Sequence, residues 1–92
     1  MYYVYVLKSE NDGNLYIGQT NNLENRVYRH NAGYIISTKK RRPLVLVYYE
    51  EFANRRQSMR REKFLKSGEG HKYLRSKLAN TAQAYGAKDE SM

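Results

Sequence analysis

Apolar and polar positions alternate near the start of the chain and predict a β-hairpin. Residues 2–7 and 15–20 both have a strand pattern rich in β-branched and aromatic side chains, and Asp12-Gly13 between them is a turn signal. A tight turn there, or a longer loop of the same parity, places Tyr5 on the same sheet face as Gly18, because a slip of one residue would expose every apolar side chain. The predicted faces are Tyr5, Leu7, Tyr16, Gly18 and Thr20 on one side, and Val4, Val6, Leu15 and Ile17 on the other.

The next segment predicts a helix that begins after Asn21 or Asn22 and ends at Gly33. Its apolar side chains define an inward stripe on a helical wheel. His30 lies within that stripe and Arg26 lies to one side of it. We therefore expect His30 to point into the protein.

The middle of the chain predicts a loop and then a strand. Residues 34–42 show no clear period and end in a basic run, which is typical of a mobile cationic loop. Residues 44–49 are continuously apolar, as in a central strand covered on both faces.

A further helix is predicted from residue 54 to about residue 67, and a shorter one over residues 71–78. On the first of these, Glu62 lies midway between two apolar residues, Met59 and Leu65. An inward carboxylate costs several kcal/mol unless a charged group meets it. The pattern leaves two partners open, an arginine such as Arg26 in a structural ion pair, or a metal ion.

Glycines at positions 68 and 70 are expected to separate these helices, and the composition becomes small and polar from Ala79. We expect one domain over residues 1–78 and a flexible tail over residues 79–92. The chain has no cysteine, which excludes a disulfide scaffold and a cysteine-ligated zinc site. It also has no apolar run of the length that a membrane span needs and no signal-peptide pattern, so we expect a soluble, cytoplasmic protein without membrane partners.

Charge points to a polyanionic partner. The 17 Lys and Arg residues against 9 Asp and Glu residues give a net charge of +8 on 92 residues. Ten tyrosines supply faces on which bases can stack, although most of them should be core residues. We expect DNA as the partner, with RNA possible. The candidate nucleic-acid-binding residues are Lys39, Lys40, Arg41, Arg42, Arg61, Lys63 and Lys66.

Several short motifs in a fixed order resemble the GIY-YIG nuclease superfamily, in particular its small standalone bacterial members. Tyr3-Val4-Tyr5 stands at the first motif, of which only the final tyrosine is kept, and Tyr16-Ile17-Gly18 matches the second in full. The segment from Gly18 to Asn31 contains Arg26 and His30 at the spacing of the family's helix. Arg61-Glu62-Lys63 is similar to the family's metal-carboxylate helix, and the match covers residues 2–78.

The resemblance implies an α+β (α/β) fold with a small three-stranded antiparallel sheet flanked by helices. It also implies metal-dependent hydrolysis of DNA phosphodiester bonds, directed by DNA structure or of low sequence specificity. Glu62 would hold one Mg²⁺ or Mn²⁺ ion, the only cofactor predicted, and Arg26 would neutralise charge at the phosphorus. Tyr5 or Tyr16 would take a proton from the attacking water, after nearby cations lower the pKa of the phenol, and His30 would orient or relay that proton.

Two other classes of function remain open from the sequence. A nucleic-acid-binding module of the same fold, with weak or absent catalysis, would use the same basic residues and tyrosines. A basic adaptor for an acidic protein would also carry the positive charge. Arg26, His30 and Glu62 favour the nuclease, because a pure binder has no need of a carboxylate beside a polyanion.

Overall fold

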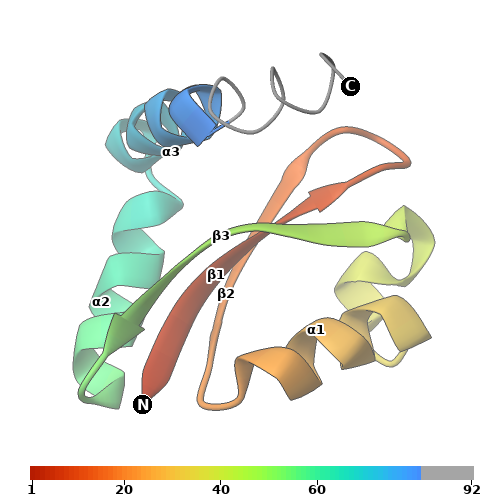
Figure 1. The fold of residues 1–92 in the computed structure, drawn as a ribbon, viewed down its shortest axis with the longest axis horizontal. Helices are drawn as coiled ribbons and strands as arrows, with labels where there is room; N and C mark the ends of the chain where they lie inside the picture. Colours follow the sequence, from red (N-terminus) through yellow and green to blue (C-terminus); the bar gives the residue numbers. More distant parts are fainter. Residues whose placement is uncertain (82–92) are drawn as a thin grey trace. The chain divides into compact units, whose positions relative to one another are not determined.

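The structure is a computed structural model that describes residues 1–81. It forms two compact units, the first comprising Met1–Glu62 and the second beginning at Lys63. Its elements in chain order (Figure 1) are β1 (Tyr2–Ser9), β2 (Leu15–Thr20), α1 (Leu23–Ala32), the 3-10 helix η1 (Ile36–Arg41), β3 (Leu44–Phe52), α2 (Arg55–Leu65) and α3 (Gly68–Thr81). The sheet and helices confirm the α+β class and the three-stranded antiparallel sheet.

The strand order is β2-β1-β3, so β1 is the central strand and pairs antiparallel with both neighbours. The prediction that residues 44–49 form the central strand was wrong, since β3 lies at an edge and Val45 and Tyr49 are exposed. An apolar run shows that a strand is buried somewhere along its length, but it does not show which strands flank it. In β3 the buried end is Leu44, which packs in the core under α1.

The hairpin register confirms the predicted parity. Tyr5 faces Gly18 and Leu7 faces Tyr16 across the β1–β2 pair, as the longer loop of the same parity requires. Gly13 in that loop has a φ of 74°, a left-handed conformation that favours glycine. The face that carries Tyr5 therefore also carries Tyr16, opposite the valines.

Helix α1 has the predicted ends. The side chain of Asn22 accepts a hydrogen bond from the Asn25 backbone N–H, and Gly33 closes the helix with a φ of 86°. The inward stripe of α1 packs on one face of the sheet, where Tyr5, Leu7 and Leu44 form a buried cluster against Leu23 and Val27.

Three predicted boundaries or orientations differ from the structure. Residues 36–41 form the 3-10 helix η1 where an irregular loop was expected. On α2 the inward position is Ser58, which is fully buried, whereas Met59 is 50% exposed. The glycines at 68 and 70 lie in the first turn of α3 rather than between helices, because the break falls at residues 66–67.

The predicted flexible tail begins inside α3, which continues to Thr81. The remainder of that prediction, residues 82–92, lies outside the described residues. No helix within residues 1–81 is long and apolar enough to span a membrane.

Candidate functional site

A glycine on β2 lets a tyrosine of β1 cross it. A Cβ atom on Gly18 would lie 2.5 Å from the Tyr5 hydroxyl oxygen, so only glycine leaves room for the phenol at this position. The Tyr5 side chain thereby reaches across the neighbouring strand, and the residue is only 1% exposed. This crossing carries the hydroxyl group from the central strand toward the C-terminal half of α1.

The Tyr5 hydroxyl is one end of a buried hydrogen-bond chain. Its oxygen lies 2.9 Å from Nε2 of His30, and Nδ1 of His30 lies 2.7 Å from Oγ1 of Thr38 in η1. His30 and Thr38 are both fully buried. The chain ends at the backbone carbonyl of Ile35, to which the Thr38 hydroxyl donates at 3.5 Å.

Burial keeps both members of the Tyr5–His30 pair neutral. It raises the pKa of Tyr5 well above the usual range for a phenol, and it lowers the pKa of His30 to about 4, with help from the charge of Arg26. A protonated phenol must donate its hydrogen, and Nε2 is its acceptor. The single N–H of the neutral imidazole is then on Nδ1 and donates to Thr38. The expectation that nearby cations lower the pKa of this phenol was wrong for Tyr5, because desolvation outweighs the effect of Arg26.

Tyr16 completes an aromatic cluster around the histidine. Its ring centroid lies 5.0 Å from that of His30 and 6.4 Å from that of Tyr5, and the Tyr16–His30 contact is edge-on. Tyr16 is only partly buried, in contrast to its two neighbours. It therefore provides a phenol on the solvent side of the buried pair.

Arg26 and Glu62 both act on the Tyr5 hydroxyl, with opposite charges. Both are partly buried, Arg26 on α1 one turn before His30 and Glu62 on α2 one turn after Ser58. The charge of Arg26 lowers the pKa of Tyr5 and that of Glu62 raises it, so both groups lie within electrostatic reach of its hydroxyl. Tyr5, Tyr16 and His30 are thus in direct contact, and the charges of Arg26 and Glu62 both act on the Tyr5 hydroxyl.

The donor set limits what a metal ion could bind. Within residues 1–81 no three His, Cys, Asp or Glu side chains cluster as a ready-made ligand set. Glu62 offers one carboxylate, which suits a Mg²⁺ or Mn²⁺ ion that keeps several waters and takes its other ligands from a substrate phosphate. A structural zinc site does not fit this set.

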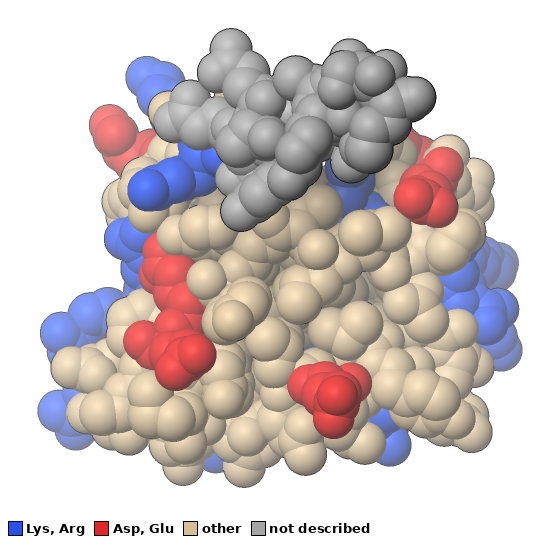
Figure 2. Space-filling view, viewed as in Figure 1, with Lys and Arg blue, Asp and Glu red and all other residues tan. Residues whose placement is uncertain are grey.

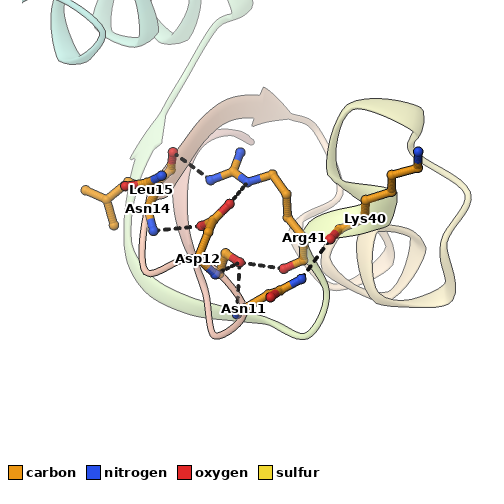
Figure 3. Close-up of polar contacts among 7 residues, drawn as sticks. Asn11, Asp12, Asn14, Leu15, Lys40 and Arg41 are labelled. Atoms are coloured by element: carbon orange, nitrogen blue, oxygen red, sulfur yellow. Dashed lines mark hydrogen bonds and ion pairs between the residues drawn. The ribbon is translucent and has the colours of Figure 1, made fainter.

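The basic segment of residues 39–42 is fastened to the β1–β2 turn (Figure 3). Arg41 donates from Nε to Asp12 at 3.0 Å and from a terminal nitrogen to the backbone of Leu15 at 3.4 Å. Asn11 donates to the Lys40 carbonyl at 2.9 Å. Arg41 therefore holds the turn, and its hydrogen bonds also lower the pKa of Asp12, after the larger effect of the Asn14 backbone.

The remaining predicted binding residues include arginines that are hydrogen-bonded within the fold and lysines that are exposed. Arg42 donates from Nε to the Lys39 carbonyl, and the side chains of Lys39 and Lys40 are exposed. Arg61 forms a two-bond pair with Glu50, at 2.8 and 3.0 Å, and Tyr48 donates to the same carboxylate. Arg61 is thus engaged within the fold.

Lys63 and Lys66 belong to the second unit and are exposed. On the face drawn in Figure 2, Lys and Arg gather toward the margins, and acidic side chains are visible among uncharged ones.

Sequence reasoning missed two residues that position the others. Thr38 lies in a stretch without periodicity, and Ser58 is a small polar residue beside an apolar one. The single hydroxyl hydrogen of Ser58 is shared between the Arg55 carbonyl at 2.8 Å and Oε1 of Gln19 at 3.3 Å. A polar residue at the inward position of α2, four residues before Glu62, was the available signal.

Comparison with known proteins gives a consistent family. The sequence profile of the GIY-YIG catalytic domain matches residues 1–75. A UPF0213 protein of Staphylococcus haemolyticus is 48% identical over 67 residues, which cover 72% of this chain and 80% of the relative. A UPF0213 protein of Clostridium perfringens is also 48% identical over 67 residues, with coverage of 72% and 71%.

The fold has a counterpart among solved structures. The solution NMR structure of a UPF0213 protein from Bacillus halodurans superimposes with a TM-score of 0.52 at 32% identity, covering 83% of this chain and 84% of that one. The names of these relatives specify no activity. Together with the motifs and the sheet described above, these matches show that the chain belongs to the GIY-YIG nuclease family, among its UPF0213 members.

Proposed function

We propose that the protein is a metal-dependent endonuclease that hydrolyses DNA phosphodiester bonds, directed by DNA structure or with low sequence specificity. The observation that carries the proposal is the buried Tyr5–His30 pair beside Tyr16, with the charges of Arg26 and Glu62 both acting on the Tyr5 hydroxyl. Phosphodiester hydrolysis needs a proton acceptor for the attacking water and positive charge at the phosphoryl oxygens. This group of side chains supplies both.

Tyr16 is the proton acceptor in this proposal. Water reaches a partly buried phenol more easily than one that is 1% exposed. Tyr5 is the poorer base, because burial disfavours its phenolate and its hydrogen is donated to His30. Tyr16 acts in this step as a phenolate that has already lost its own proton to solvent. Its oxygen takes a proton from the water, the water oxygen forms a bond to phosphorus, and the bond from phosphorus to the leaving oxygen breaks.

Tyr5 and His30 act as positioning residues behind Tyr16. Thr38 and Tyr5 bind the two ring nitrogens of His30, so the imidazole cannot rotate without breaking a buried hydrogen bond. Its ring fixes the edge-on contact with Tyr16. The phenol that receives the proton is therefore held by a rigid, neutral pair.

Arg26 neutralises the charge that develops on the phosphoryl oxygens. Its planar guanidinium can donate two hydrogen bonds to a phosphate, and its partial burial strengthens their electrostatic effect. Removing one such group in other enzymes lowers turnover by about 10²- to 10³-fold.

Glu62 would hold the metal ion. When bound, a Mg²⁺ or Mn²⁺ ion acts as a Lewis acid on a phosphate oxygen and stabilises the leaving oxygen. A site with one protein carboxylate binds the ion weakly without substrate, so Glu62 and the DNA phosphate together determine the affinity.

A cleavage assay tests the proposal. The purified protein is incubated with supercoiled, single-stranded and branched DNA, and with RNA, in Mg²⁺, in Mn²⁺ and in chelator. We expect metal-dependent cleavage of at least one DNA substrate and none in chelator. Binding to nucleic acid without cleavage of any substrate would favour the binding module instead.

A further inference from the structure

A small polar hollow adjoins the candidate site where α2 begins. It has a volume of about 140 Å³ and is lined by Tyr2, Gln19, Thr20, Asn21, Arg26 and Arg55. Pockets for drug-sized molecules have volumes of about 300–1,000 Å³. The hollow is therefore large enough for a phosphate group and too small for a whole nucleotide.

The hollow is positively charged. Arg26 and Arg55 both line it, and no acidic residue does. Within residues 1–81, the side chains of these two arginines form no ion pair. Two guanidinium groups on one small hollow repel each other unless an anion lies between them.

Hydrogen bonds from a buried serine hold the wall of the hollow in place. Ser58, which is fully buried, shares its single hydroxyl hydrogen between the Arg55 backbone carbonyl at 2.8 Å and Oε1 of Gln19 at 3.3 Å. This contact ties the first turn of α2 to β2 and engages the acceptor atom of the Gln19 amide. The donor atom, Nε2, remains for a ligand that accepts hydrogen bonds.

Arg26 connects the hollow to the candidate active site. It lines the hollow, and its charge also acts on the pKa values of Tyr5 and His30. A phosphate in the hollow would thus lie next to one at the tyrosines, as consecutive phosphates do along a nucleic-acid strand. We infer that the hollow binds a backbone phosphate adjacent to the scissile one, through Arg55 and Gln19, an inference that rests on the proposed function.

A salt titration of DNA binding tests Arg55 against its neighbour. Binding of a fluorescent oligonucleotide is measured by anisotropy in chelator for the wild type, Arg55→Gln and Arg56→Gln. Arg56 is the control: it is an exposed arginine next to Arg55 that does not line the hollow. Arg56→Gln removes the same charge as Arg55→Gln without changing the hollow. Removing one cation that neutralises a phosphate reduces the magnitude of the slope of log K against log salt by about 0.7–0.9. The loss of affinity between 50 and 200 mM salt is then about threefold smaller than for the wild type.

We expect this reduction for Arg55→Gln and a smaller one for Arg56→Gln, with unchanged thermal melting for both. A scan of the oligonucleotide with single neutral methylphosphonates then locates the contact. One substitution next to the cleaved bond should weaken wild-type binding and leave Arg55→Gln binding unchanged. The same measurement on Arg56→Gln should still show the weakening.

The results separate this inference from the proposed function. The phosphate site is refuted, and the nuclease stands, if the wild type cleaves DNA but Arg55→Gln and Arg56→Gln reduce the slope equally. The same conclusion follows if every methylphosphonate that weakens wild-type binding also weakens binding by Arg55→Gln. If the protein cleaves no substrate, the nuclease fails, whatever the salt titration shows.

Discussion

Two arginine-containing regions of the first unit use their guanidinium groups differently. In the basic segment of residues 39–42, Arg41 binds Asp12 and a backbone carbonyl, and Arg42 binds the Lys39 carbonyl. At the edge of β2, Arg26 and Arg55 line a hollow that no acidic residue lines. The segment with the denser positive charge thus commits its arginines to the fold, and the sparser region keeps them available for an anion.

This difference shows that a net charge of +8 does not reveal which basic side chains are available to bind an anion. Arg61, on the same helix as Arg55, is paired with Glu50, although both look alike in a basic run. Whether a cation is available depends on carboxylates and carbonyls that the fold brings to it from distant parts of the chain. In the basic segment, the two exposed lysines, Lys39 and Lys40, are the candidate phosphate contacts.

Glu62→Gln should have the largest effect, because it removes the proposed metal ligand and keeps the side-chain volume. We expect cleavage to fall by about 10²-fold or more while DNA binding survives, since less negative charge then faces the DNA. Glu51→Gln, at an exposed carboxylate on β3, is the matched control and should cleave normally. Nicking of supercoiled DNA and anisotropy measure the two effects.

Thermal melting of the same variant tests the structural alternative. If Glu62 instead served only in a structural ion pair, removing its charge would leave the partner cation uncompensated and lower the stability, by up to about 3–5 kcal/mol for a fully buried pair. A folded Glu62→Gln protein of wild-type stability and wild-type cleavage rate would contradict the metal-ligand role.

His30 predicts a pH dependence of stability that the exposed regions do not share. Its pKa is lowered to about 4 in the folded state from a reference value of 6.5. Below pH 6.5 the unfolded chain takes up a proton that the folded protein excludes, so stability falls between pH 6.5 and pH 4, by at most about 3 kcal/mol. Above pH 6.5 this contribution is constant.

Urea denaturation at several pH values measures this decrease in stability. A His30→Gln variant should lack it, and His71→Gln, at the exposed second histidine, should retain it. An unchanged stability of the wild type between pH 6.5 and pH 4 would mean that His30 titrates freely in the folded protein.

Tyr5→Phe and Tyr16→Phe compare the buried Tyr5–His30 pair with the partly exposed phenol of Tyr16. Tyr5→Phe leaves Nε2 of His30 buried without its donor and should cost about 1–3 kcal/mol of stability. Tyr16→Phe removes a partly exposed hydroxyl, so we expect little change in stability and a loss of cleavage. Melting curves beside single-turnover cleavage rates distinguish them. Full cleavage by Tyr16→Phe would transfer the role of base to another group.

Local patterns in the sequence were enough to predict much of this site. Alternation of apolar residues determines the parity of the hairpin and puts Tyr5 and Tyr16 on one face. Asparagine and glycine caps define α1, and helical spacing then turns His30 inward. Each of these inferences depends on residues that are neighbours along the chain or within one element.

The features that could not be predicted depend on contacts between distant segments. Thr38 binds His30 from η1, a stretch with no period, and Arg61 meets Glu50 from another element. The edge position of β3 likewise depends on which strands pair, which an apolar run leaves undetermined. Burial also reverses the expected shift of the Tyr5 pKa, because its extent is a property of the whole fold.

The smallest effects are expected for the basic segment of residues 39–42. They test whether its arginines are committed to the fold while its lysines contact DNA. Changing Lys39 and Lys40 together to Gln should flatten the dependence of DNA binding on salt by about 0.7–0.9 for each phosphate that a lysine no longer neutralises. Arg41→Gln should change this slope less, because its guanidinium is bound to Asp12 and Leu15, and should instead loosen the β1–β2 turn. Anisotropy titrations and amide hydrogen exchange in the turn measure the two outcomes. If Arg41→Gln flattens the salt dependence as much as the lysine pair and leaves exchange in the turn unchanged, Arg41 contacts DNA after all, and the division between committed and available arginines does not hold.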